Sequence, residues 1–302
     1  MAQFNRGTPL FIPGAMWVHY AGRRRLCFRP VMIDKKDLDL IRRLVRTAAL
    51  EELMSRFESV SAEFKADGSL ITAADLAMQH RLQAELASHW PQYRLLGEEM
   101  DQAQQEDLLR SPGPGIWCLD PLDGTGNFAA GIPFFAVSLA LICNGSVQAA
   151  VVYDPCRDEC FSALRGQGAW LNGKSLAAAA SPADLKNAMA MVDLKRLPDP
   201  LIRAIAKKSP YRSQRSFGSV ALDWCWIAGG RCQVYLHGGQ KLWDYAAGYL
   251  VMSESGAVGG LLAGYDGNWL TDFSLSPRIA VAATHENLLQ QWRAWIIRGL
   301  EA

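Results

Sequence analysis

The chain has 302 residues, half of them hydrophobic, which is enough for one large domain or two closely packed ones with a substantial core. Its 31 lysines and arginines nearly balance 30 aspartates and glutamates, so no basic field favours nucleic acid binding. The seven cysteines are scattered, and the close pair Cys156 and Cys160 lacks zinc-site spacing, so we interpret them as reduced thiols of a cytoplasmic protein. No apolar run reaches the roughly 18 residues that a membrane span needs.

The first 31 residues differ in composition from the rest of the chain. They contain no acidic residue, carry the basic cluster Arg23–Arg25, and are interrupted by Pro9, Pro13 and Pro30. The basic cluster follows the apolar stretch, which is the reverse of the order in a secretory signal. We therefore expect residues 1–31 to be a poorly ordered extension ahead of the domain, with a targeting segment as the alternative.

Two amphipathic segments follow this extension. Apolar residues recur at spacings of three and four from Lys36 to Leu50 and from Ala74 to Leu86, which predicts two helices. Residues 65–72 between them are typical of an Asp-Gly turn followed by a short extended piece. Beyond the second helix, apolar runs bounded by turn residues predict strands at 94–96, 116–119, 134–143 and 147–153.

The second half of the chain alternates between the two kinds of element. Strands are predicted at 188–192, 233–236 and 279–282, and helices at 200–207, 220–228, 245–254 and 286–297. Interleaved strands and helices without an internal repeat indicate a layered α/β architecture. The alanine-rich stretch 177–182 is the predicted seam between an N-terminal subdomain, residues 32–180, and a C-terminal one, residues 181–302.

The most informative segment for function is an apolar strand that ends in two aspartates, Asp120 and Asp123. Pro121 fixes φ between them, and the turn brings both carboxylates to one side. Together with the free carbonyl of Leu122 they form an oxygen-only half-site of the kind that Mg²⁺ prefers. Residues 124 and 125 open a turn or a helix, and their N–H groups can face a phosphate. Two acids near a glycine are also common in ordinary Asp-Gly turns.

Two other acidic segments occupy similar positions at the ends of predicted elements. Gly97-Glu98-Glu99 follows a short apolar strand, where the alternative is a solvated acidic loop. Asp244 starts a helix with small residues behind it, where the alternative is a helix cap. Cys118 lies beside this constellation, and we expect it to point into the core, away from the neighbours of Asp120.

Together these segments resemble the inositol monophosphatase family of Mg²⁺-dependent, lithium-inhibited phosphatases. The resemblance covers roughly Asp34 to Arg298 and rests on four motifs in the expected order: TxxD at 72–75, Gly-Glu-Glu at 97–99, DPxDGTxN at 120–127 and Trp-Asp-x-Ala-Ala-Gly at 243–248. It implies an αβαβα sandwich of the inositol monophosphatase and fructose-1,6-bisphosphatase type. It also implies a cytoplasmic, homodimeric phosphoric monoester hydrolase with a small phosphorylated substrate and neither a nucleic acid nor a membrane partner.

Carried across residue by residue, the resemblance implies two to three Mg²⁺ ions. Glu98, Asp120 and the carbonyl of Leu122 would hold the first ion, and a third, weaker ion would lie near Glu98. Asp120, Asp123 and Asp244 would hold the second ion. Millimolar Li⁺ would inhibit by occupying this second position after the ester is cleaved.

The resemblance also implies the residues that act on the substrate. Asp75 and Thr125 would orient and deprotonate a water molecule on the first metal, which attacks the phosphoryl group directly, and Glu98 would complete the catalytic set. The substrate contacts that it implies are Asp123, Gly124, Thr125, Ser219, Val220 and His237.

The class of phosphate ester is less strongly indicated. The stretch after Asn127 resembles the inositol monophosphatase branch, although Gly126 replaces the usual Thr or Lys. A glutamate that contacts inositol hydroxyls in the animal enzymes is His237 here, in a Leu-His-Gly-Gly-Gln segment that predicts an exposed loop. The alternative enzyme is a 3′(2′),5′-bisphosphate nucleotidase. The alternative from another class is a regulatory protein that binds the transcription machinery.

Overall fold

The computed structural model describes residues 15–20, 23–28, 33–57, 62–64, 70–110, 113–179, 182–265 and 267–301. Strands β1 (Ala15–Tyr20) and β2 (Arg23–Phe28) form an antiparallel hairpin. The remainder of the predicted N-terminal extension lies outside the described residues, so its expected lack of order stays a prediction.

The larger sheet has seven strands in the order β11-β10-β9-β8-β7-β6-β5. Its strands are β5 (Arg94–Gly97), β6 (Ile116–Asp123), β7 (Ala136–Cys143), β8 (Ser146–Asp154), β9 (Glu159–Leu164), β10 (Gly168–Leu171) and β11 (Lys174–Leu176). Neighbours pair antiparallel except for β5 and β6, which run parallel with Gly97 opposite Leu119. The carboxyl ends of β5 and β6 therefore lie side by side.

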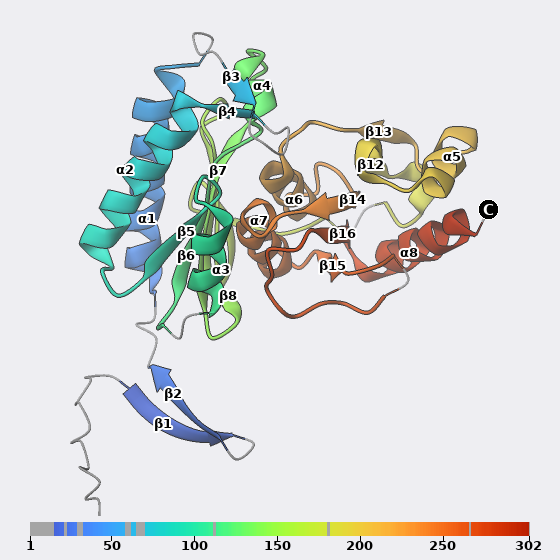
Figure 1. Ribbon diagram of the computed structural model, residues 1–302. Helices are drawn as coiled ribbons and strands as arrows, with labels where there is room; N and C mark the ends of the chain where they lie inside the picture. The colour runs from blue at the N-terminus through green and yellow to red at the C-terminus, as the bar shows by residue number, and fades with distance from the viewer. Residues whose placement is uncertain are drawn as a thin grey trace, which may run out of the picture.

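Two long helices cover one face of this sheet (Figure 1). They are α1 (Lys35–Ala48), which continues into a π-helical turn at Ala49–Met54, and α2 (Ala73–His89). A capping box of Asp34 and Asp37 begins α1. The side chains that α1 buries recur at spacings of three and four, as the sequence predicts: Leu38, Ile41, Val45 and Ala48.

The other face of the larger sheet packs against α6 (Val220–Ala228) and α7 (Leu242–Glu254). Because both faces are covered, β6 and β7 are buried along nearly their whole length. Alternate residues of β6 enter opposite cores: Trp117 and Leu119 pack with α1 and α2, and Cys118 packs with α7.

The smaller sheet has five strands in the order β13-β12-β14-β16-β15. They are β12 (Met189–Asp193), β13 (Ser213–Arg215), β14 (Val234–Gln240), β15 (Val258–Leu262) and β16 (Arg278–Ala283). One face packs on α6 and α7, and the other on α5 (Asp199–Lys207) and α8 (Glu286–Leu300). Figure 1 shows the resulting layers, which confirm the expected αβαβα sandwich.

Several short elements complete the described chain. They are β3 (Ala62–Phe64), β4 (Leu70–Thr72), α3 (Gln102–Arg110), α4 (Thr125–Ala129) and the 3₁₀ turns Leu185–Asn187 and Leu194–Arg196. The sequence did not predict α3, β3, β9 to β11, β13 or β15, and it left open whether a turn or a helix begins at the position of α4. The chain passes from one sheet to the other between β11 and β12, but the division into two subdomains after residue 180 stays a prediction. In the described part of the chain, no helix combines the length and the apolar character that crossing a membrane requires.

The contact between α6 and α7 depends on Gly248. A Cβ atom at this position would lie 2.6 Å from the Cβ of Trp224 and 3.1 Å from the carbonyl oxygen of Ala221. We expect Gly248→Ala to push the two helices apart and to cost about 1–3 kcal/mol in the free energy of unfolding. Urea denaturation measures this loss, with the exposed Ser253→Ala on the same helix as the control. Equal stability of the two variants would contradict the close packing.

Candidate active site

The ends of β5 and β6 bring the first acidic residues together. The N–H of Glu98 donates to the carbonyl of Leu119 (3.1 Å), which continues the parallel pairing past β5. Asp120 pairs with Ser138 on β7, whereas Asp123 pairs with Ala136, so β6 contains one extra residue between these pairs. This bulge bends the strand where its acidic residues lie. Asp120 itself is 2% exposed.

Asp123 is attached to the amino end of α6. Its carboxylate accepts hydrogen bonds from the hydroxyl of Ser219 (2.5 Å) and from the N–H groups of Val220 (3.2 Å) and Ala221 (2.7 Å). The amino end of a helix carries partial positive charge, which suits a carboxylate. Burial nevertheless raises the pKa of Asp123 to about 6. Ser219 and Val220, which the sequence predicted as substrate contacts, therefore bind the carboxylate of Asp123 in this structure.

Asp244 enters from the first turn of α7. Its carboxylate accepts a hydrogen bond from the N–H of Lys241 (2.8 Å), so the capping interaction considered from the sequence is present. The hydroxyl of Ser138 donates to the carbonyl of Trp243 (3.0 Å). Since Ser138 pairs with Asp120 across the sheet, this bond fixes the start of α7 opposite Asp120.

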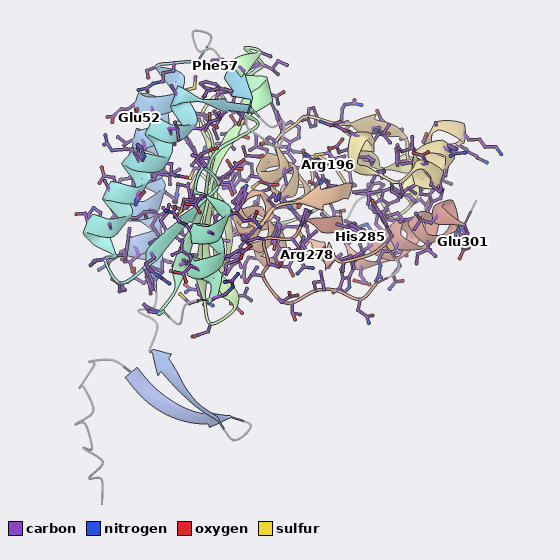
Figure 2. All side chains as sticks on the ribbon, viewed as in Figure 1. Glu52, Phe57, Arg196, Arg278, His285 and Glu301 are labelled. Carbon is purple, nitrogen blue, oxygen red and sulfur yellow. The ribbon has the colours of Figure 1, made fainter. Side chains whose placement is uncertain are left out.

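These acidic side chains lie close enough to repel one another. The pKa of Asp120 is raised well above its ordinary value, first by burial and then by the charges of Glu98, Asp123 and Asp244. Burial and the charges of Glu98 and Asp123 also raise the pKa of Asp244. The hydrogen bond from Lys241 and the positive charge of Arg196 act in the opposite direction and lower it. Figure 2 labels Arg196 between α6 and β12 in this view.

The donor set fits a hard divalent cation. Four acidic side chains, two of which have pKa values raised by burial and by neighbouring negative charges, provide oxygen ligands of the kind that Mg²⁺ takes. Among the described residues, however, no three His, Cys, Asp or Glu side chains already form a group that could hold a metal ion. Asp120 accepts from the N–H of Leu122 (3.0 Å), and Asp123 and Asp244 accept from helix N–H groups. Cation binding therefore requires some carboxylate oxygens to exchange these partners.

The predicted pair of Asp75 and Thr125 is brought together although 50 residues separate them. Asp75 lies in the first turn of α2, where it accepts from the N–H (2.7 Å) and hydroxyl (2.6 Å) of Thr72. The hydroxyl of Thr125 lies 3.1 Å from Asp75 and 3.0 Å from the carbonyl oxygen of Leu122. Its single proton can go to one of these acceptors at a time. Burial raises the pKa of Asp75.

The turn after β6 is tied to the loop before α6. Gly124 has φ +98°, and a Cβ there would lie 3.1 Å from the carbonyl oxygen of Phe134. The amide of Asn127 donates to the carbonyls of Phe134 and Phe217, both at 2.7 Å. The sequence did not assign this role to Asn127. It connects two segments that surround Asp123.

His237 does not occupy the exposed loop that the sequence predicted. It lies on β14, 4% exposed, with Nε2 3.3 Å from a carboxylate oxygen of Asp193. Its Nδ1 accepts from the N–H of Gly239 (3.2 Å), which leaves Nε2 as the protonated nitrogen of a neutral ring. Burial lowers the pKa of His237. The expectation was wrong because β14 continues through Gly238 and Gly239 with an irregular register against β16.

Cys118 points into the core as expected, but the expectation that it points away from the neighbours of Asp120 was wrong. Residues two apart on a strand point to the same face, so Cys118 shares the side of Asp120. The pKa of its thiol is raised by burial and by the charges of Asp120 and Asp244. It is therefore an uncharged, buried neighbour of the acidic cluster.

A cavity of about 880 Å³ lies outside this cluster, between α2, β5 and α3. Gln79, Glu99 and Trp117 contribute to its wall, whereas Asp120, Asp123 and Asp244 do not. The acidic cluster is thus identified by its chemistry and not by the size of a cavity.

The end of β6 thus places crowded carboxylates beside a Thr-Asp pair. The model of the inositol monophosphatase family matches residues 35–298. Inositol monophosphatase 1 of Solanum lycopersicum is 35% identical over 64% of this chain and 72% of its own length. Nus factor SuhB of Escherichia coli is 34% identical over 67% of this chain and 75% of its own. An IMPase structure from Thermotoga maritima has a TM-score of 0.74 and 25% identity, covering 88% of this chain and 98% of that one. The chain belongs to the inositol monophosphatase family.

The crowded carboxylates predict an unusual effect of Asp120→Asn on stability. A carboxyl group whose pKa is raised by folding stabilises the protein below the unfolded pKa of about 3.9, and this contribution is lost as pH rises through the folded value. We expect the metal-free Asp120→Asn variant to be more stable than wild type at about pH 8, because the neutral amide avoids the cost that burial and neighbouring charges impose on the carboxylate. The difference shrinks toward about pH 4, where the wild-type carboxyl is protonated.

Thermal unfolding in the presence of a chelator measures this effect. The exposed Asp39→Asn provides the matched control, which we expect to show no gain at high pH. If Asp120→Asn were less stable than wild type at about pH 8, the proposed crowding of charge would be incorrect.

Proposed function

We propose that the protein is a Mg²⁺-dependent phosphate monoester hydrolase of the inositol-1-monophosphatase type. The observation that carries this proposal is the contact of Asp75 with Thr125, whose hydroxyl also reaches the carbonyl of Leu122 beside Asp120. A buried carboxylate, a hydroxyl and an acidic cation site at one point suit the hydrolysis of a phosphate ester by water. Family membership supports the same activity.

Each group has a distinct part in this proposal. Glu98, Asp120, Asp123, Asp244 and the carbonyl of Leu122 would hold two to three Mg²⁺ ions, which would supply positive charge to the phosphoryl oxygens. The chain's own residues act on the attacking water.

The hydroxyl of Thr125 takes a proton from the water as its own proton passes to Asp75, so the water oxygen becomes a better nucleophile. The N–H groups of Gly124 and Thr125 bind the phosphate oxygens. The P–O bond to the alcohol breaks as the new one forms, the leaving alkoxide takes a proton from a solvent water, and Asp75 returns its proton to solvent.

We further propose that His237 lies at the side of the site that receives the alcohol. The animal enzymes have a glutamate at this position. Here His237 is paired with the carboxylate of Asp193 instead. His237 positions the partly exposed carboxylate of Asp193, which can accept hydrogen bonds from hydroxyls of a polyol. We also propose that the protein is a cytoplasmic homodimer. Sedimentation equilibrium measures the oligomeric state.

A panel of phosphate monoesters tests the activity and its substrate class. With Mg²⁺ present, we expect kcat/KM to be higher for inositol 1-phosphate than for adenosine 3′,5′-bisphosphate. We expect Asp120→Asn to abolish turnover because a neutral amide removes charge from the cation site. Asp39→Asn serves as the exposed control. The reverse preference would favour the nucleotidase, and absence of turnover on the whole panel would contradict an enzymatic role.

The Thr-Asp pair predicts a separate kinetic effect. Thr125→Ala and Asp75→Asn are expected to lower kcat by about 100-fold or more while KM changes little, because the pair acts on the water in the transition state. Thr125→Ser retains the hydroxyl and is expected to retain most of the activity. Steady-state kinetics with matched melting temperatures distinguish this from loss of folding. A raised KM with unchanged kcat would refute the role.

The similarity to the Escherichia coli Nus factor supports a second candidate, a regulatory role through binding of the transcription machinery. Such a role does not depend on turnover. Complementation of a strain that lacks the gene separates the two candidates, because Asp120→Asn removes catalysis and leaves the outer surface unchanged. Failure of this variant to complement favours the enzyme, and full complementation favours the binding role.

A further inference from the structure

Two buried glutamines hold the backbone around Glu98 from different helices. The amide nitrogen of Gln105, on α3, donates to the carbonyls of Gly97 (2.9 Å) and Glu98 (3.2 Å). The amide oxygen of Gln79, on α2, accepts from the N–H of Glu99 (3.2 Å). Both side chains are 5% exposed. The peptide groups before and after the Glu98 side chain are therefore fixed by bonds of opposite polarity.

The glycine that precedes the two acids fits this arrangement. A Cβ atom at Gly97 would lie 2.1 Å from the amide oxygen and 2.7 Å from Cδ of Gln79. Any side chain at position 97 would displace the Gln79 amide from Glu99. The Gly-Glu-Glu segment thus requires glycine because Gln79 occupies the space of its side chain.

The same helix also carries Asp75. Asp75 and Gln79 are four residues apart on α2, so they lie on one face of the helix. One end of this face contacts Thr125 and the next turn contacts Glu99. Through α2, the position of the Thr-Asp pair and the position of the Glu98 turn are linked by one rigid element.

We infer that Gln79 and Gln105 are positioning residues, which fix the backbone of Glu98 beside Asp120 and thereby set the affinity of this edge of the site for a divalent cation. This inference rests on the proposed function, in which Glu98 is a cation ligand. Polar groups that orient the ligands of a metal typically change its affinity by about 10- to 100-fold when they are removed.

The opposite polarity of the two glutamines gives a test in which side-chain size hardly changes. Gln105→Glu presents carboxylate oxygens to two carbonyl oxygens and loses both hydrogen bonds. Gln79→Glu keeps an oxygen that can accept from the N–H of Glu99. Gln104→Glu is the matched control. Gln104 is the exposed neighbour of Gln105 on α3, and its substitution introduces the same negative charge without removing the hydrogen bonds of Gln105.

The experiment is calorimetric titration of the metal-stripped full-length chain with Mg²⁺, with the melting temperature of each metal-free variant measured in parallel. We expect Gln105→Glu to weaken Mg²⁺ binding by about 10-fold or more. We expect Gln79→Glu and Gln104→Glu to bind no more weakly than wild type. Equal weakening by all three, or no weakening by a folded Gln105→Glu, overturns the inference.

A second set of variants tests the inference if Gln105→Glu does not fold. Gly97→Ala displaces the amide of Gln79, so it is expected to weaken Mg²⁺ binding to the same extent as Gln79→Ala. The double variant is expected to be no weaker than either single one, because both changes break the same bond. If the double variant loses as much Mg²⁺ affinity as the two single variants together, the inference is overturned. If wild type binds no Mg²⁺, the proposed function fails together with it, whereas tight wild-type binding without these variant effects overturns the inference alone.

Discussion

Asp120, Asp123 and Asp244 are held near one another by hydrogen bonds from the backbone, while burial and mutual repulsion oppose their ionisation. Burying several like charges together is costly even with these hydrogen bonds, so the surrounding fold must hold the arrangement in place. The amino ends of α6 and α7 supply N–H groups, and the bulge of β6 directs the aspartates toward them. The metal-free fold therefore holds these carboxyl groups close together although their proximity and burial raise the pKa values of Asp120 and Asp244.

The layered architecture follows from this requirement. The helices α6 and α7 lie between the two sheets (Figure 1), and hydrogen bonds join the start of α6 to Asp123 on β6 and the start of α7 to Ser138 on β7. The close approach at Gly248 keeps them together, and Ser138 connects the larger sheet to the start of α7. Asn127 joins the turn after β6 to the loop before α6. The second half of the chain thus contributes one acidic side chain directly and holds another in place.

Sequence patterns predicted the parts of the structure that depend on local apolar periodicity. The helices with a buried face, α1 and α8, and the long central strands were expected near their observed positions. Helix α3 was not, because its sequence is polar and Gln105 is the residue that it buries. The short strands β9 to β11 were missed since turns interrupt them every few residues. In the site, the motifs indicated which acids converge, but the partners of Asp123 and the burial of His237 depend on tertiary contacts.

The residues that the sequence did not single out share one property. Gln79, Gln105 and Asn127 all use side-chain amides to bind backbone groups of site loops. Amides of this kind have no distinctive spacing, and their role becomes evident only when distant segments are placed together. The acids were found because they cluster at strand ends, whereas the groups that position them are scattered over α2, α3 and α4.

The central claim is that Glu98, Asp120, Asp123 and Asp244 form one cation site. Anomalous diffraction from crystals soaked in Mn²⁺, which replaces Mg²⁺ with oxygen ligands, tests it most directly. The account predicts anomalous peaks among these four carboxylates, with the oxygens of Asp123 or Asp244 turned from helix N–H groups toward the ion. Fully soaked crystals without a peak among them, or with peaks only elsewhere on the protein, would contradict it.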